Sequence, residues 1–151
     1  MQDFKDIPQR NYVQKQEYIV QEYIEKPLLI ENYKFDLRLY VLITSLRPYI
    51  VYFCTEGMSR FCTKEYQPPT PHNIKNPFMH LTNYSLNKKN EDYEFNIKAN
   101  FDTGSKRTFS FVMDHLDKIG FDKEVVMEDI RYLIRMLMIS LHPFLVFNFD
   151  C

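Results

Sequence analysis

The sequence predicts a single α+β domain with a central antiparallel sheet, a hairpin and two helices near the carboxyl-terminal end. Apolar and polar residues alternate from Lys34 to Thr44, as they do in a strand. A glycine-containing segment at residues 55–57 separates two apolar runs, and helical apolar spacing occurs on both sides of Gly120. The length of 151 residues suits one domain. These observations together favour a mixed fold over an all-helical or all-strand one.

Composition and charge narrow the class of protein. The 19 Lys and Arg residues nearly balance the 20 Asp and Glu residues, which leaves a net charge of −1. A chain with so little net charge is not expected to bind nucleic acid or an anionic membrane through charge alone. Only three glycines occur, and none falls in a GxGxxG or GxxxxGK(S/T) pattern. A phosphate site in this protein would therefore differ from a Rossmann turn or a P-loop.

Further features predict a cytoplasmic protein without a membrane span. The longest run without a charge, Met136 to Phe149, has 14 residues, whereas a bilayer span needs about 20. The polar start of the chain does not look like a signal segment. Three cysteines without a CxxC pair indicate neither a disulfide framework nor a zinc knuckle, and the histidines show no metal-ligand spacing. No metal site is expected.

The first expected elements are extended. The run Tyr18–Ile24 predicts a strand, which Pro27 would end because proline donates no backbone hydrogen bond. Residues 28–30 are expected to form a second extended segment. A turn at Glu31-Asn32 would then reverse the chain.

The clearest pattern lies between Lys34 and Thr44. Side chains alternate between the two faces of a strand, so this pattern predicts one long strand with an apolar and a polar face. The polar face carries Lys34, Asp36, Arg38 and Tyr40. The apolar face carries Phe35, Leu37, Leu39, Val41 and Ile43.

A hairpin and a long loop should follow. The apolar runs Tyr49–Cys54 and Met58–Thr63 flank Gly57, which predicts two strands joined by a glycine turn. Residues 64–77 hold four of the eight prolines and are expected to be a loop. Residues 79–88 are expected to be irregular, and residues 89–105, which are polar, to be exposed.

Two helices should end the domain. The first carries an apolar stripe and stops at Gly120, a residue suited to the left-handed conformation after a helix. The second begins after Asp122, a favourable N-cap residue, and should end at Pro143. The first stripe comprises Phe109, Val112, Leu116 and Ile119. The second comprises Val126, Ile130, Leu133, Leu137 and Leu141.

The polar face of the long strand is the first candidate for chemistry. A spacing of two places Lys34, Asp36 and Arg38 on one face, about 6.6 Å apart. Two cations on either side of a carboxylate could follow a chain of phosphates, with the acid orienting a cation or a ribose hydroxyl. The alternative is a solvated strand face with weak cross-strand pairs. Arg60, on the neighbouring strand, could share this face.

Four blocks of sequence resemble the tubulin tyrosine ligase-like family. In chain order they are VQEYIEKPLLIENYKFDLRLYVLITS, EGMSRFCTKEY, MHLTNYSLNKKNEDYE and GSKRTFS. The resemblance covers the chain from about Tyr18 to Phe149, and the third and fourth blocks look most like the glutamate-adding branch. It implies an ATP-grasp domain that is incomplete over 1–151, with sheet and nucleotide-site segments at 17–88 and a helical segment at 106–143.

Carried over by position, the resemblance implies a nucleotide site. Two residues, Arg38 and His80, match catalytic positions near the phosphates. The residues that match ATP-contacting positions are Gln21, Glu22, Tyr23, Ile24, Lys34, Asp36, Thr82 and Asn83. The resemblance thus agrees with the alternation argument on the face that carries Lys34, Asp36 and Arg38.

The resemblance also implies the substrates. Arg60, Tyr84, Ser85 and Lys106 match positions that hold free L-glutamate. ATP and magnesium are the implied cofactors, and tubulin or microtubule tails the implied partner. A tail carboxylate would be activated as an acyl phosphate, and the amine of glutamate would displace the phosphate. The implied location is the cytoplasm and cytoskeleton, with the cilium or basal body as a further family location.

The resemblance is incomplete at both ends, and three interpretations stay open. The family's magnesium ligands, an Asp and a Glu-x-Asn after the last helix, are not found before Cys151, and its amino-terminal half is missing. We therefore expect no ATP turnover by these residues alone. The chain could be a fragment or incomplete gene model of a tubulin polyglutamylase. It could instead be a short non-catalytic protein that binds nucleotide or tubulin, or a domain of another ATP-grasp-like lineage.

Overall fold

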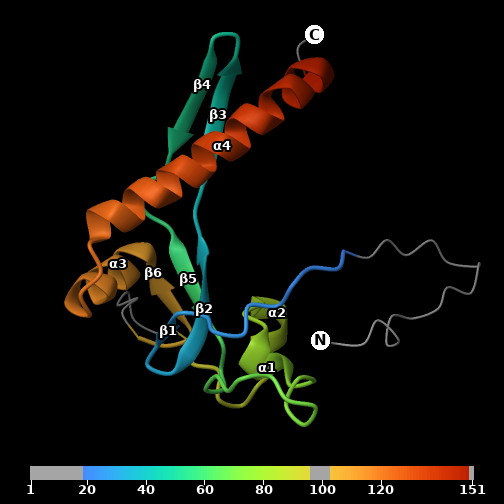
Figure 1. The fold of residues 1–151 in the computed structure, drawn as a ribbon, viewed down its shortest axis with the longest axis vertical. Helices are drawn as coiled ribbons and strands as arrows, with labels where there is room; N and C mark the ends of the chain where they lie inside the picture. Colours follow the sequence, from blue (N-terminus) through green and yellow to red (C-terminus); the bar gives the residue numbers. More distant parts are fainter. Residues whose placement is uncertain (1–18, 96–102, 150–151) are drawn as a thin grey trace, which may run out of the picture.

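The computed structural model describes residues 19–95 and 103–149. These residues form an antiparallel sheet, a two-stranded ribbon and helices, which confirms the predicted α+β class (Figure 1). The strands are β1 (Leu29–Ile30), β2 (Tyr33–Arg38), β3 (Val41–Leu46), β4 (Tyr49–Phe53), β5 (Met58–Phe61) and β6 (Lys106–Thr108). The helices are α1 (Pro77–His80), α2 (Tyr84–Asn87), α3 (Phe109–Lys118) and α4 (Lys123–Phe149).

The main sheet has the strand order β1-β2-β5-β6, with every pair antiparallel. The predicted turn between β1 and β2 is confirmed. Ile30 pairs with Tyr33, and the two residues between them, Glu31 and Asn32, have φ angles of 54° and 67°. Positive φ at both central residues is the signature of a type I′ turn, whose twist matches that of the strands it joins.

The hydrophobic core lies between the apolar face of this sheet and α3. Phe35 and Leu37 of β2 pack against it, as the alternation predicts, and the first turns of α4 cover its edge. Burial of these aliphatic and aromatic side chains is the main force that holds the sheet to the helices. The buried members of the core are Ile30, Phe61, Phe109, Val112, Met113 and Leu116.

The prediction of one strand from Lys34 to Thr44 is wrong, because the chain changes partners in the middle. β2 pairs with β5, whereas β3 pairs with β4 in a separate two-stranded sheet. At the break, a Cβ atom on Gly57 would lie 2.4 Å from the carbonyl oxygen of Arg38. Only glycine allows the backbones to come this close.

The predicted hairpin between Tyr49–Cys54 and Met58–Thr63 is also wrong. Residues 55–57 connect the two sheets, and the actual hairpin joins β3 to β4 through a cis Arg47–Pro48 peptide bond. The apolar runs were placed correctly, but their partners depend on tertiary contacts. The sequence alternation of a strand specifies its faces and leaves its neighbours open.

No strand forms over residues 19–24, and Tyr18 lies outside the described residues. Ile19, Val20 and Ile24 are exposed, and the segment joins no sheet in the part of the chain that the structure describes. Two tyrosines hold it instead: Tyr23 contacts His80 and Lys34, and Tyr66 donates a hydrogen bond to the carbonyl of Glu25 (2.6 Å). The residues of this run favour a strand, but a strand does not form here because no neighbouring strand pairs with the segment.

The predicted loop over residues 64–77 is confirmed up to the start of α1. The region expected to be irregular, residues 79–88, holds the second half of α1 and the short helix α2. Asn76 caps α1 by accepting a hydrogen bond from the amide of Phe78 (3.1 Å). Strand β6 was not predicted, since three residues are too few to show a period. Of the polar segment 89–105, residues 96–102 lie outside the described residues, and Ser105 is buried rather than exposed.

The two carboxyl-terminal helices are confirmed, and so is Asp122 as the cap of the second; the cap of the first, Thr108, was not predicted. The side chain of Thr108 accepts from the amide of Phe111 (3.1 Å) at the start of α3, and Gly120 follows the helix with a φ of 95°. Asp122 accepts from the amide of Glu124 (2.9 Å) at the start of α4. These contacts satisfy amides that a helix start would otherwise leave unpaired.

Pro143 does not end α4, which continues to Phe149. The β3–β4 hairpin contacts the helix in the turn that precedes the proline. The ring of Tyr49 stacks on His142 with a centroid distance of 4.1 Å, and its hydroxyl donates to the carbonyl of Met138 (3.1 Å). The ring nitrogen Nε2 of His142 lies 3.0 Å from the carbonyl oxygen of Leu46. These contacts offset the local cost of proline in a helix.

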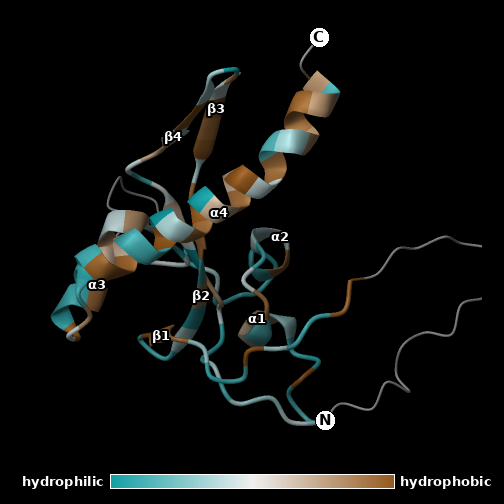
Figure 2. Cartoon of the chain, turned by 45° about the horizontal axis from the view of Figure 1, so that its top comes forward, coloured by the Kyte–Doolittle hydropathy of each residue, from teal (hydrophilic) through white to brown (hydrophobic). Residues whose placement is uncertain are grey.

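Beyond the core, much of the apolar surface of α4 is exposed. Val126 and Ile130 pack on the core, but Leu133 and Leu137 of the predicted stripe are more than half exposed. Apolar residues are prominent toward the far end of the helix in Figure 2. In contrast to the expectation, α4 is by length and composition long and apolar enough to cross a membrane, and none of its most apolar stretch is buried.

Candidate functional site

The polar face of the main sheet carries a row of charged residues across three strands. Asp36 of β2 is paired in register with Arg60 of β5, and Arg60 with Lys106 of β6. Residues that face each other across antiparallel strands point to the same side of the sheet. Lys34 and Arg38 share this face with Asp36 because they are two residues away on the same strand. The predicted sharing of one face by Arg60 and Arg38 is therefore confirmed.

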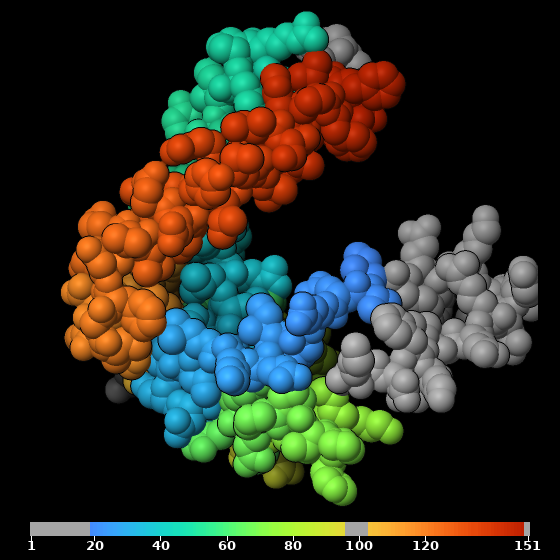
Figure 3. All heavy atoms as spheres, in the orientation of Figure 1, coloured from blue at the N-terminus to red at the C-terminus, as the bar shows by residue number. Residues whose placement is uncertain are grey.

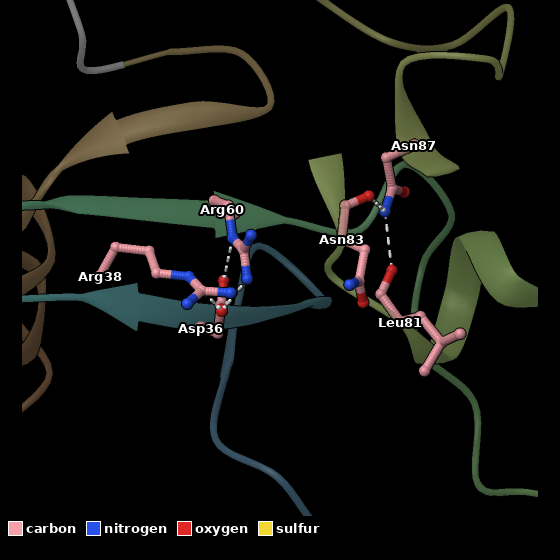
Figure 4. Close-up of polar contacts among 6 residues, drawn as sticks. All are labelled: Asp36, Arg38, Arg60, Leu81, Asn83 and Asn87. Carbon is pink, nitrogen blue, oxygen red and sulfur yellow. Dashed lines mark hydrogen bonds and ion pairs between the residues drawn. The ribbon is translucent and has the colours of Figure 1, made fainter. Parts of the chain in front are cut away.

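Asp36 and Arg60 form a two-point ion pair (Figure 4). Arg60 Nε donates to Asp36 Oδ1 at 2.9 Å, and Arg60 Nη2 donates to Oδ2. Arg38 Nε lies 3.4 Å from the same carboxylate. The hydrogen bond to Asp36 raises the pKa of Arg60 above its ordinary value. One carboxylate thus orients two permanent cations, which leaves a net positive charge suited to an anionic ligand.

Lys34 is held by a tyrosine from the amino-terminal segment. Its Nζ atom donates to the hydroxyl of Tyr23 at 3.1 Å and lies 4.3 Å from the centre of the same ring. The Tyr23 hydroxyl in turn lies 2.9 Å from Nδ1 of His80. Burial, followed by the nearby charge of Lys34, lowers the pKa of His80 below its ordinary value. Both effects favour a neutral imidazole.

The loop between α1 and α2 is fixed by the buried amide of Asn87. Asn87 Nδ2 donates to the carbonyls of Leu81 (2.7 Å) and Asn83 (3.1 Å), as Figure 4 shows. Asn87 Oδ1 accepts from the amide and the hydroxyl of Thr63, at 3.1 and 3.0 Å. All hydrogen-bonding groups of the side chain are therefore used, and the backbone on both sides of Thr82 is tied to the end of β5.

Thr82 and Tyr84 from this loop and helix lie beside the charged row of the sheet. Together with Arg60 and Lys106 they line a closed gap that has no room for a water molecule. Lys106 Nζ lies 3.8 Å from the centre of the Tyr84 ring, a cation–π contact. The two cations and the hydroxyl groups around this gap are a combination suited to a carboxylate ligand.

The structure brings many of the predicted residues together in connected groups. Lys34, Tyr23 and His80 form one group, and Asp36, Arg38 and Arg60 form a second. Arg60 also lines the gap described above, with Thr82, Tyr84 and Lys106. The others are exposed outside these groups: Gln21, Glu22, Ile24, Asn83 and Ser85. The roles assigned to all of these residues stay predictions.

Sequence reasoning missed two residues that organise these groups. Asn87 is 1% exposed and holds the 81–83 loop, and Tyr66 packs edge-to-face on His80 with a centroid distance of 5.8 Å. Asn87 follows Asn83 by four residues, which is the spacing of one helical turn. This spacing was the one signal in the sequence that Asn87 could contact Asn83. Nothing in the sequence around Tyr66 indicated its position.

The described ranges, 19–95 and 103–149, contain no group of three His, Cys, Asp or Glu side chains placed to hold a metal ion. These residues therefore do not fit a magnesium site built by the protein alone, and we derive no step through magnesium. The cationic face does fit the phosphates of a nucleotide, since Lys34, Arg38 and Arg60 lie on one side of the sheet.

We predict that Cys62 resists alkylation while Cys54 reacts. Cys62 is buried, and burial raises the pKa of its thiol to about 11, so it stays protonated at pH 8. Cys54 is exposed. Because the thiolate is the nucleophile, iodoacetamide at pH 8 should label Cys54 before Cys62, as measured by peptide mass mapping. Denaturant should make both react alike, and equal rates in the folded chain would contradict this burial.

Comparison with known proteins identifies the family. The model of the tubulin-tyrosine ligase family matches residues 1–147. The chain therefore belongs to the tubulin-tyrosine ligase family, which confirms the resemblance found in its sequence. The α+β structure is consistent with part of an ATP-grasp domain. The division of the chain into segments 17–88 and 106–143 stays a prediction.

Several curated relatives are named as tubulin polyglutamylases. The chain is 46% identical to tubulin polyglutamylase TTLL11 of Homo sapiens over 143 residues, which is 95% of this chain and 20% of the relative. It is 43% identical to tubulin polyglutamylase ttll6 of Danio rerio over 87% of the chain and 16% of the relative. A probable beta-tubulin polyglutamylase of Tetrahymena thermophila is 40% identical over 87% of the chain and 11% of the relative. The chain thus spans about a fifth or less of these relatives.

Proposed function

We propose that this chain is part of an ATP-dependent ligase that adds glutamate to tubulin tails. Two lines of support converge. The relatives described above are tubulin polyglutamylases by name. The single structural observation that carries the proposal is the row Asp36–Arg60–Lys106, flanked by Lys34 and Arg38 on one sheet face. The proposed location is the cytoskeleton of the cytoplasm, where the substrate would be.

The reaction joins a carboxylate to an amine. ATP, when bound, would supply the phosphoryl group that activates a tail carboxylate, and the amine of free glutamate would then displace phosphate. The requirement on the protein is to hold several negative charges close together and to orient them. Lys34 and Arg38 would bind the phosphates, while Asp36 orients Arg38 and Arg60 through the ion pairs described above.

The gap beside Tyr84 would hold free glutamate. Arg60 already uses Nε and Nη2 on Asp36, so its remaining N–H groups would meet the carboxylate, and Lys106 adds a point charge. The gap is closed in this structure, so glutamate would have to displace the Lys106 ammonium from the Tyr84 ring.

Nucleotide titration of the 151-residue chain tests the proposal. We expect ATP to bind, measured by calorimetry, and Lys34→Met to weaken binding by about 10-fold, because a charged hydrogen-bond donor to phosphate is lost. Lys118→Met, which removes an exposed lysine of α3, is the matched control and should bind as the wild type does. An absence of ATP binding, or an unchanged affinity in Lys34→Met, would contradict the assignment of this face.

A further inference from the structure

Three side chains from separate segments form a continuous chain of hydrogen bonds that begins with Lys34 on the polar sheet face. Lys34 Nζ on β2 donates to the Tyr23 hydroxyl at 3.1 Å. That hydroxyl lies 2.9 Å from Nδ1 of His80, the last residue of α1. The three residues are far apart in sequence, so the contact is made only by the fold.

The chemistry of the groups sets the direction of these hydrogen bonds. An ammonium group can only donate, so Lys34 uses a lone pair of the Tyr23 oxygen. The hydroxyl hydrogen is then available for His80 Nδ1, which accepts it as a neutral imidazole. The second ring nitrogen of His80, Nε2, must carry the remaining ring proton.

The burial of His80 argues against direct contact with a substrate. Its side chain is 4% exposed, and the rings of Tyr23 and Tyr66 each pack edge-to-face on it at 5.8 Å. Among the described residues, Nε2 is buried and has no partner at hydrogen-bond geometry, although the Asn73 backbone interacts with the ring and acts to raise its pKa. A buried donor without a full hydrogen bond destabilises the fold, so packing alone does not require an imidazole at this position. What the imidazole adds is the acceptor Nδ1, which faces Tyr23.

We propose that His80 is a positioning residue that acts through the Tyr23 hydroxyl to hold the Lys34 ammonium on the polar sheet face. This inference rests on the proposed function, in which Lys34 binds phosphate. With one N–H directed to Tyr23, the other two N–H groups of Lys34 remain for a ligand. A flexible lysine is thereby ordered before the anion arrives, which reduces the entropy lost on binding.

Three variants separate this role from packing. Tyr23→Phe keeps the ring over which the Lys34 ammonium lies and removes the hydroxyl. His80→Phe keeps a ring of similar size and removes the acceptor. His80→Asn places an amide oxygen near the position of Nδ1, so it should restore the acceptor. A purely structural role for His80 would make the two His80 variants differ in stability alone.

The first readout is the NMR signal of the Lys34 ammonium group, assigned by its loss in Lys34→Met. A hydrogen-bonded ammonium is ordered and exchanges slowly, so we expect the signal in the wild type and in His80→Asn. It should be lost in Tyr23→Phe and His80→Phe. An unchanged signal in a folded His80→Phe chain would overturn the proposal. If that variant fails to fold, the imidazole nitrogen shifts of the wild type decide: protonation of His80 on Nδ1 would overturn it equally.

The second readout is ATP affinity. We expect Tyr23→Phe and His80→Phe each to weaken binding about 5-fold, the size of one lost hydrogen bond, and His80→Asn to recover it. In the Lys34→Met background His80→Phe should have no further effect, and a further loss there would overturn the proposal. A wild type that binds no ATP but shows the expected ammonium signals would refute the proposed function and leave the positioning role standing.

Discussion

Replacing Asn87 with alanine is expected to lower the free energy of unfolding by about 3–5 kcal/mol. The side chain is 1% exposed and makes four hydrogen bonds to groups of Thr63, Leu81 and Asn83. Alanine would leave buried or partly buried backbone groups without partners, and these cannot all reach water. The loop that carries Thr82 should loosen at the same time.

Denaturant unfolding followed by circular dichroism measures this effect. Asn148→Ala is the matched control, because Asn148 donates a similar hydrogen bond to the carbonyl of Phe144 but lies exposed on α4. We expect the control to change stability by less than about 0.5 kcal/mol. If Asn87→Ala and the control behaved alike, Asn87 could not be the residue that anchors the loop.

Arg107→Met should lower the free energy of unfolding by about 2–4 kcal/mol, the second-largest effect that we expect. Arg107 forms a two-point ion pair with Glu31, and its guanidinium lies 4.5 Å from the ring centre of Phe61 and 4.9 Å from that of Phe111. The side chain of Arg107 is 9% exposed and that of Glu31 53%. Because Glu31 can regain water, the loss should be smaller than for a fully buried pair.

The pH dependence of stability distinguishes this pair from simple packing. The hydrogen bond from Arg107 lowers the pKa of Glu31 below 4.5. A carboxyl whose folded-state pKa is depressed stabilises the fold above its unfolded-state pKa and loses that contribution as pH falls through the folded value. The wild type should therefore lose stability below about pH 4.5 more steeply than Arg107→Met does.

Arg131→Met is the control for Arg107→Met. Arg131 pairs with Glu128 on the exposed surface of α4 at 3.6 Å, so its removal should change stability by less than about 0.5 kcal/mol. Chemical denaturation from pH 3 to 7 measures both the stability of the two variants and the pH dependence of the wild type and Arg107→Met. Parallel pH profiles for the wild type and Arg107→Met would show that Glu31 draws no stability from the pair.

Local signals in the sequence were sufficient for several elements. Asp122 caps α4, and Gly120 follows α3 with positive φ, both as predicted. The alternation around Asp36 indicated the correct polar face, and the resemblance to a family pointed to the same residues. Errors occurred where an element depends on its neighbours, as at Pro143, where contacts with Tyr49 keep the helix intact.

The candidate site divides in the same way. The polar parity of Lys34, Asp36 and Arg38 could be predicted, since alternation follows from the geometry of any strand. The pairing of Asp36 with Arg60 was not predicted, because it depends on the register of β2 and β5, which alternation leaves open. Figure 3 shows a hollow between α4 and the segment that begins at residue 19. These two segments are far apart in sequence, so no sequence pattern could predict that they border the same hollow.

The sequence by itself determined the α+β class, the presence of two helices with the Asp122 cap between them, the polar strand face and the family. These features depend on residues close together in sequence and on sequence motifs, both of which can be recognised without the structure. The tertiary structure alone decided which strands pair, where β2 gives way to β3, and how His80, Tyr23 and Lys34 meet. Such contacts join residues distant in sequence, and they form because burying the shared core outweighs the preference of each segment on its own.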